Sequence, residues 1–425
     1  MQKKVLNKVD KKFMFEDMPE IITLKNGLRI IYKEALGTQT TQCGFVINTG
    51  ARDDGDFPGL AHCFEHMLFK GTTKRNATQV LKRLEVVGGE LNAFTGKDLT
   101  TVYAHVLSIH FKRATELLAD IVLNSSFKEK ELAREKKVIK EEINLYLDTP
   151  EENIFDEFQK LQYPHHPMGY NILGDEESLQ TIDSPTLREF WKKFYHPKNM
   201  AYVVISNIPF KQVVRACKFM ETWENGEFYK PDRAEPGKDV RFSKVVETEF
   251  NQVYACLGAE SYPYHHPKKE AMMLLNNILG GPGMNSRLNL AVREKHGLTY
   301  QIDSSYTAYD DCALFYITFS TEEKHLKKTL KLIEKELQLL IDTPLTKYQL
   351  QQAKNQFHGQ LQLAEESKTS LLVYYGKSSL KYNSIEGLDE LLAKVSIVTI
   401  EELQAVAQQM LQFNKLNTLI FKPSK

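Results

Sequence analysis

The sequence predicts an α+β protein of two homologous domains, each an antiparallel-rich mixed sheet with helices packed on one face. Its 425 residues are too many for one ordinary domain and suit two domains of similar size. The order of strand and helix patterns in the first half also recurs in the second half. Because small loop insertions explain the slight drift between the two copies, we infer an internal duplication.

The first half begins with a hairpin pattern, in which two apolar segments flank the turn Asn26-Gly27. A polar run rich in turn formers then precedes a short apolar helix, and a Gly88-Gly89 break separates a second helix from the strands that follow. Two long helices close the repeat. The expected elements are strands 21–24, 28–32 and 43–47, helices 60–69 and 77–87, strands 91–94 and 100–106, and helices 109–122 and 128–147.

The second half repeats this order, with a helix that ends at Gly280-Gly281. Its expected elements are strand 252–257, helix 268–279, strand 314–319, and helices 322–340 and 346–366. Between the halves, the chain is polar and rich in turn-forming residues, which is typical of a linker. We therefore expect an N-terminal domain at 1–220, a linker at 221–239 and a C-terminal domain at 240–425.

The composition argues against several classes of partner. Basic and acidic residues number 55 each, so net charge does not indicate nucleic acid or an anionic membrane. No stretch approaches the roughly 20 apolar residues that span a bilayer, and Met1–Glu16 lacks the features of a secretion signal or a mitochondrial presequence. The five cysteines are scattered without metal-binding or redox spacing, as in a reducing compartment. We expect a cytoplasmic protein.

The run His62-Cys63-Phe64-Glu65-His66 predicts a metal site on the first apolar helix. Residues four apart share a helix face, so both imidazoles can bind one ion. Glu65 is placed to accept a proton from a water on that ion, and the order His-x-x-Glu-His is that of the inverted zinc-peptidase motif. The alternative is a chance pair of surface histidines beside a glutamate. The apolar neighbours argue against this, because polar groups on a mainly buried helix need partners.

A catalytic zinc uses three protein ligands and one open position, so the third ligand must come from elsewhere. The long helix at 128–147 offers Glu135 and Glu142, which lie two turns apart on one face, whereas Glu141 points away. One of the pair suits a ligand and the other a supporting carboxylate, and helix geometry alone leaves the assignment open. The alternative for each is a solvated charge among lysines.

The duplication provides an internal control, because the second half lacks every candidate ligand. When the halves are aligned on their strands and glycine breaks, the motif on the first helix falls opposite residues 272–276. Glu142 falls opposite Gln360, and Glu135 falls opposite Ala353. We therefore expect one metal ion per chain.

These residues resemble those of the M16 metallopeptidase family, which includes pitrilysin, insulin-degrading enzyme and the mitochondrial processing peptidase. The run Gly59–Thr72 is close to the family signature, and the likeness covers nearly the whole chain at the length of the two-domain members. The resemblance implies that Glu142 is the third zinc ligand and Glu135 the supporting glutamate. It also implies a zinc-dependent endopeptidase with Glu65 as the general base.

Two further stretches resemble substrate-binding segments of the family. Gly88–Thr95 looks like the edge strand that pairs with an extended peptide, which implies contacts from Asn92 and Ala93. A segment of the second half looks like the one whose arginine and tyrosine reach the substrate, which implies that Arg293 and Tyr300 hold substrate carbonyls and stabilise the oxyanion. Without the resemblance, Asn92 would be interpreted as a turn residue, Arg293 as a surface charge and Tyr300 as a core aromatic.

The family architecture implies a chamber of four such domains that encloses peptides or small unfolded polypeptides. Two domains per chain then require a dimer. A homodimer is self-sufficient because this chain carries both the metal site and the Arg293–Tyr300 pair, and a heterodimer with a second M16 subunit is the alternative. Other functions left open are a processing peptidase for targeting presequences and a non-catalytic structural subunit. The complete ligand set favours an enzyme, and the absence of a visible presequence favours peptide degradation.

Overall fold

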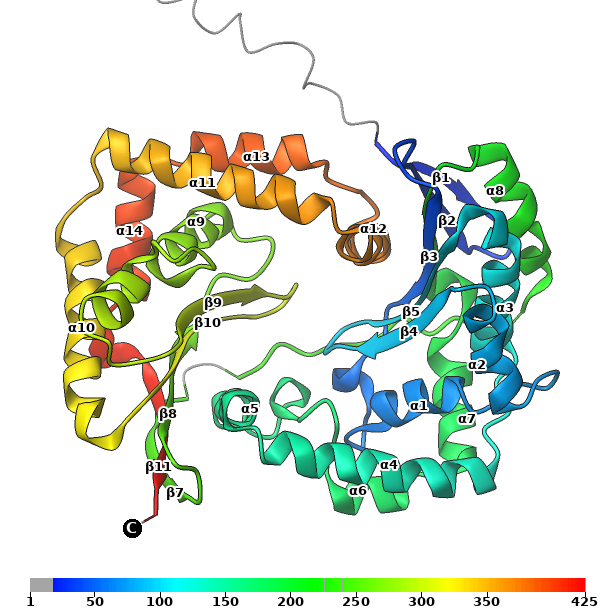
Figure 1. The fold of residues 1–425 in the computed structure, drawn as a ribbon, viewed down its shortest axis with the longest axis horizontal. Helices are drawn as coiled ribbons and strands as arrows, with labels where there is room; N and C mark the ends of the chain where they lie inside the picture. Colours follow the sequence, from blue (N-terminus) through cyan, green and yellow to red (C-terminus); the bar gives the residue numbers. More distant parts are fainter. Residues whose placement is uncertain (1–17, 225, 238–239, 425) are drawn as a thin grey trace, which may run out of the picture. The chain divides into compact units, whose positions relative to one another are not determined.

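The computed structural model describes residues 18–224, 226–237 and 240–424 (Figure 1). These residues form two compact units. The first unit contains the residues up to Glu141 together with Ile172–Asp232 and Gln362–Leu391, and the second contains Glu142–Asn171, Arg233–Leu361 and the chain from Leu392 onward. The expectation for Met1–Glu16 lies outside the described residues.

The first unit contains a six-stranded sheet in the order β1-β2-β6-β3-β5-β4. Its pairs are antiparallel except β2–β6, which is parallel. The central strands β3 and β6 are buried almost along their whole length, and β6 is a nearly continuous apolar run, as expected for strands that are covered on both faces. The strands are β1 (Glu20–Thr23), β2 (Arg29–Glu34), β3 (Thr40–Ile47), β4 (Glu90–Thr95), β5 (Thr100–Leu107) and β6 (Met200–Ser206).

The second unit contains a five-stranded sheet in the order β7-β11-β8-β10-β9. Here β11–β7 is the parallel pair and the remaining pairs are antiparallel. The strands are β7 (Ser243–Thr248), β8 (Val253–Glu260), β9 (Ile302–Ala308), β10 (Ala313–Thr321) and β11 (Asn417–Pro423). This order and pairing repeat those of β2-β6-β3-β5-β4, which confirms the predicted α+β fold with two related sheets.

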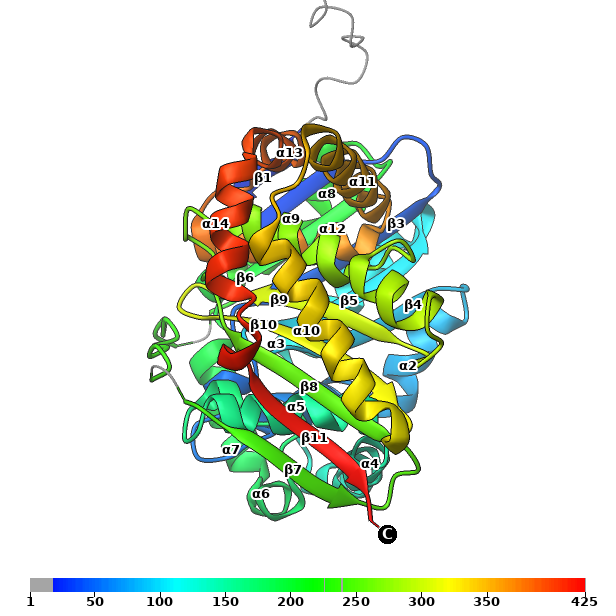
Figure 2. The ribbon, with the colours of Figure 1, turned by 90° about the vertical axis from the view of Figure 1, so that its left-hand side faces the viewer.

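Helices cover one face of each sheet. In the second unit α9, α10 and α14 bury their apolar sides against β8 and β10 (Figure 2). The helices of the first half are α1 (Leu60–Leu68), α2 (Ala77–Glu85), α3 (Phe111–Leu123), α4 (Glu129–Leu147), α5 (Pro150–Gln162), α6 (Glu176–Thr181), α7 (Ser184–Phe194) and α8 (Phe210–Cys217). Those of the second half are α9 (Lys269–Gly280), α10 (Leu326–Asp342), α11 (Lys347–Glu365), α12 (Lys368–Tyr382), α13 (Leu388–Ile397) and α14 (Ile400–Met410).

One helix from each half of the chain packs on the opposite face of the other half's sheet. Helix α12 belongs to the first unit, where Leu372 and Tyr375 pack against Val46 and its neighbours on that sheet. Helix α5 belongs to the second unit, where Phe158 packs against Cys256 on the second sheet. The compact units therefore differ from the expected sequential domains 1–220 and 240–425 by an exchange of segments.

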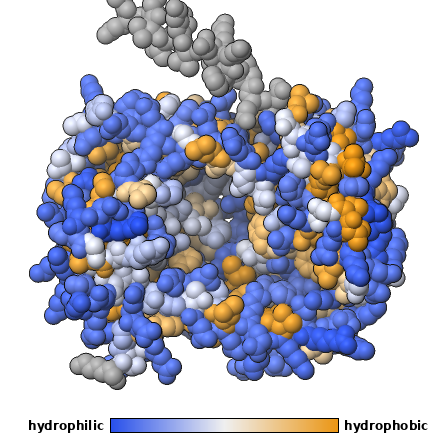
Figure 3. All heavy atoms as spheres, viewed as in Figure 1, coloured by the Kyte–Doolittle hydropathy of each residue, from blue (hydrophilic) through white to orange (hydrophobic). Residues whose placement is uncertain are grey.

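The junction between the units after Asp232 falls inside the segment 221–239 that was expected to be a linker. Among the described residues, no helix is both long enough and apolar enough to cross a bilayer. The face of the molecule seen in Figure 3 is mainly hydrophilic, in keeping with the charged fraction of 26%.

Candidate metal centre

Helix α1, which carries the histidine motif, is held firmly at its first turn. Gly59 precedes it with φ 89°, and a Cβ there would lie 2.5 Å from the carbonyl oxygen of Leu173, so only glycine fits. Because glycine has no side chain to cap the helix, the carboxylate of Asp54 does so by accepting hydrogen bonds from the backbone N–H of Gly59 (2.7 Å) and Ala61 (2.8 Å). The start of α1 is therefore fixed by a residue upstream of it.

His62 and His66 lie one turn apart on α1, and their ring centroids are 4.6 Å apart. His62 is buried with only 6% of its surface exposed. Helix α4 brings Glu142 to the same place, and one ligand atom from each of the three residues lies within 4.8 Å of the others. No other group of three or more histidine, cysteine or acidic residues of this kind occurs among the residues that the structure describes.

This donor set fits zinc. Two imidazole nitrogens and one carboxylate oxygen are typical of a catalytic zinc site, which keeps a fourth position open. Zinc–nitrogen and zinc–oxygen bonds are about 2.0–2.2 Å long. The ligand atoms of His62, His66 and Glu142 lie within 4.8 Å of one another, so small side-chain movements would bring all three to bonding distance from one ion.

Glu135 lies two turns before Glu142 on α4 and faces a different neighbour. Its carboxylate is hydrogen-bonded to His66 Nδ1 (2.9 Å) and forms an ion pair with Lys70 Nζ (2.6 Å). Burial raises the pKa of Glu135, but the hydrogen bonds from His66 and Lys70 outweigh burial and lower the pKa overall. The ionised carboxylate accepts a hydrogen bond from Nδ1–H, which leaves the Nε2 lone pair of His66 available to a metal.

Glu65 is buried beside the histidines and contacts the sheet. The hydroxyl of Thr95, the last residue of β4, donates a hydrogen bond of 2.6 Å to Glu65 Oε2. Cys63, between the two histidines, is a buried thiol, and burial raises its pKa to about 12. The thiol therefore stays protonated at neutral pH, which suits a packing role better than a nucleophilic one.

The edge strand of the first sheet lies beside α1. Strand β4 pairs with β5 on one side and has no strand on its other side in the sheet order. Along β4, exposure alternates, with Asn92 exposed and Ala93 partly buried. The side-chain oxygen of Asn92 accepts a hydrogen bond of 2.9 Å from the N–H of Ala93.

Arg293 and Tyr300 lie together in the second unit. The guanidinium carbon of Arg293 is 5.7 Å from the centre of the Tyr300 ring, a cation–π distance. Arg293 belongs to a π-helical turn (Asn289–Glu294), a rare conformation that is frequent at functional sites. Tyr300 is 85% exposed and is not a core aromatic. The Arg293 side chain is 35% exposed and lies near the carboxylate of Glu294, at 3.9 Å.

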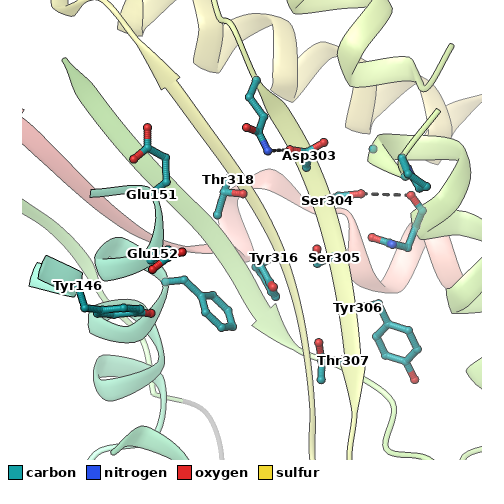
Figure 4. A pocket seen from close by; sticks show the side chains of 16 residues that line it. Tyr146, Glu151, Glu152, Asp303, Ser304, Ser305, Tyr306, Thr307, Tyr316 and Thr318 are labelled. Atoms are coloured by element: carbon teal, nitrogen blue, oxygen red, sulfur yellow. Dashed lines mark hydrogen bonds between the residues drawn. The ribbon is translucent and has the colours of Figure 1, made fainter. Parts of the chain in front are cut away.

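The second unit also contains a cavity of about 850 Å³ that the sequence did not indicate. Figure 4 shows side chains of α5 on one side and strands β9 and β10 on the other. Glu151, Glu152 and Asp303 contribute three carboxylates to its lining, so its electrostatic character favours a cationic group. Sequence reasoning also gave no role to Lys70 or Thr95, whose partners lie 65 and 30 residues away along the chain.

Comparisons with known proteins place the chain in a family. Residues 29–176 match the insulinase family, peptidase family M16, and residues 181–357 match the domain described as the peptidase M16 inactive domain. The uncharacterized zinc protease YmxG of Bacillus subtilis is 33% identical over 91% of this chain and 94% of its own length. An uncharacterized zinc protease of Streptomyces coelicolor is 30% identical over 92% of this chain and 86% of its own length. The chain belongs to the M16 peptidase family.

Solved structures share the fold. A protease from Helicobacter pylori superposes with a TM-score of 0.87 at 22% identity and covers 96% of this chain and 100% of its own. A peptidase M16 inactive domain from Pseudomonas fluorescens has a TM-score of 0.86 at 21% identity, with 96% of this chain and 98% of that chain covered. At these identities the likeness establishes the two-sheet architecture.

Proposed function

We propose that this chain is a zinc-dependent endopeptidase that hydrolyses peptides or small unfolded polypeptides. The observation that carries the proposal is the convergence of His62 and His66 of α1 with Glu142 of α4, with ligand atoms within 4.8 Å of one another. Helix α1 also carries Glu65. The relatives named zinc proteases support both the metal and the reaction class. When bound, zinc supplies a Lewis acid that polarises the scissile carbonyl and lowers the pKa of water.

The remaining chemistry belongs to the side chains. Glu65 accepts the proton of the attacking water and passes it to the leaving amine, which is the general-base and general-acid role of a buried carboxylate. Glu135 does not touch the reacting atoms. It orients the His66 ring through Nδ1, and Lys70 keeps its carboxylate in place.

We propose that the substrate lies along β4. The unpaired edge of this strand can form backbone hydrogen bonds with an extended peptide, so binding depends on backbone more than on side chains. Asn92 and Ala93 would make these contacts. Arg293 and Tyr300 would hold substrate carbonyls and stabilise the developing oxyanion.

We further propose that two chains form a homodimer whose four domains enclose the substrate, in the cytoplasm. The location is supported by five cysteines that are all buried free thiols, as in a reducing compartment. Sedimentation of the purified chain with parallel assays of each species tests the assembly. We expect activity in the dimer, and an active lone monomer would contradict the chamber. Activity that appears only after a second M16 subunit is added would indicate a heterodimer.

Replacing Glu65 by Gln tests the reaction. The amide keeps the shape of the side chain but cannot accept the water's proton, so we expect one zinc per chain to remain and cleavage to fall about 100- to 10,000-fold. The readouts are elemental zinc content and hydrolysis of a library of internally quenched peptides. A Glu65→Gln enzyme as active as wild type would rule out this mechanism.

The same library separates the competing functions. Cleavage at many sites supports degradation, whereas cleavage confined to basic presequence-like peptides would indicate a processing peptidase. Wild-type protein that contains zinc but cleaves no member, alone or with a second M16 subunit, would indicate a structural subunit. The residues that line the cavity between α5 and β9 do not predict which peptide sequences are cleaved.

A further inference from the structure

We propose that Thr95 is a positioning residue for Glu65. We also propose that a buried ion cluster of Asp98, Arg52 and Lys381 fixes the turn that follows Thr95. The inference rests on the proposed peptidase function, in which Glu65 is the base. It adds a residue outside the motif, on the strand where we place the peptide, and it connects the base to helix α12 from the far end of the chain.

The contact between Thr95 and Glu65 is direct. The Thr95 hydroxyl donates a hydrogen bond of 2.6 Å to Glu65 Oε2, and only 9% of Glu65 is exposed. A bond to a carboxylate is stronger than one between neutral groups. Threonine also has few side-chain rotamers, so its hydroxyl is directed by the backbone. Holding one carboxylate oxygen restricts rotation of the whole group and gives the other oxygen a constant direction.

The backbone that directs Thr95 is fixed from two sides. Thr95 pairs with Thr100 at the end of the β4–β5 hairpin, and Gly96 N–H closes the turn on Leu99 O at 2.8 Å. The backbone of Ala51 and Arg52 also holds this turn. Ala51 N–H donates a hydrogen bond to Gly96 O and Arg52 N–H donates one to Lys97 O, each at 3.0 Å.

Side chains reinforce the same turn. Asp98 forms a buried ion pair with Arg52 (3.2 Å) and another with Lys381 of α12. The three side chains are only 2–4% exposed, where an ion pair is poorly screened by solvent and its loss is costly. All three residues belong to the first unit.

The segment from Gly50 to Asp54 therefore serves both partners of the contact. Ala51 and Arg52 hold the turn that ends β4, and Asp54 caps the helix that carries Glu65. Because one short segment fixes the backbone of both Thr95 and Glu65, their 2.6 Å contact is built into the fold.

The test compares Thr95→Val, which removes the hydroxyl at nearly constant volume, with Thr95→Ser, which restores a hydroxyl. Thr101→Val is the matched control, because Thr101 is a buried neighbour on β5 whose hydroxyl has no hydrogen-bond partner among the described residues. The assay is hydrolysis of the best-cleaved peptide of the library, with zinc content and the thermal midpoint measured in parallel.

We expect Thr95→Val to lower kcat about 10- to 100-fold, the usual effect of losing a hydrogen bond to a charged group. KM and zinc content should stay at wild-type values, because the Thr95 hydroxyl is directed at Glu65, whereas the proposed peptide contacts are made by the backbone of β4. Thr95→Ser should recover most of the lost kcat, and Thr101→Val should match wild type.

Each contrary result has a distinct meaning. Wild-type kcat in Thr95→Val, with Glu65→Gln inactive, would overturn the positioning role and leave the proposed function standing. Thr95→Ser as slow as Thr95→Val, or an equal loss in Thr101→Val, would also overturn it. Full activity in Glu65→Gln would instead remove the proposed function.

Discussion

Two glutamates on one helix face have different neighbours in this protein. Glu142 joins the histidines, while Glu135 binds the far side of the His66 ring and Lys70. Both lie on the side of α4 that also contains the buried residue Ile139, and Glu141 is exposed. The distinction between ligand and supporting residue therefore depends on where His66 meets the helix.

For individual residues, the sequence predicts which side chains belong to the site better than it predicts the contacts between them. The spacing of His62, Glu65 and His66 implies a shared helix face, because helical geometry is local. The choice between Glu135 and Glu142 could not follow from spacing, since both lie on that face. No sequence pattern indicated a role for Thr95 either, because its contact with Glu65 depends on how the end of β4 packs against α1.

Secondary-structure elements followed local patterns closely. The hairpin around Asn26-Gly27, helix α1 and the long helices α4 and α11 all appear within a few residues of their expected bounds. The exchange of α5 and α12 between the units was not predicted. Amphipathic periodicity indicates that a helix has an apolar face, but it does not tell which sheet that face covers.

Glycine marks the place where α12 meets its sheet. A Cβ at Gly376 would lie 2.4 Å from Val46 Cγ2, so the helix can approach the strand only without a side chain there. A similar approach occurs in the second unit, where a Cβ at Gly258 would lie 3.1 Å from the Phe158 ring of α5. Close packing at both places depends on residues that carry no apolar signal.

We expect Gly376→Ala to lower the free energy of unfolding by about 1–3 kcal/mol, because overpacking outweighs the gain in helix propensity. Gly359→Ala on α11 is the matched control, since its Cβ would meet nothing within 4 Å. That change should raise stability by up to about 1 kcal/mol. The measurement is the urea midpoint of both variants. An equal increase in the two would contradict the close contact between α12 and Val46.

At the scale of the whole chain, the two halves share a scaffold but not a metal site. Helices α4 and α11 are each 19 residues long, and Gln360 occupies in α11 the position that Glu142 occupies in α4. Among the described residues, the second half provides no comparable group of ligands. The second half instead contains the Arg293–Tyr300 pair, which we propose as a substrate contact.

The zinc content of the purified, zinc-loaded chain tests the metal site most directly. Elemental analysis should find one zinc per chain in the wild type and in Glu141→Gln, which changes an exposed neighbour on the same helix. Glu142→Gln should hold much less than one, because it loses a negatively charged ligand. A Glu142→Gln protein that retains zinc as well as the wild type, or a wild type that binds none, would contradict the account.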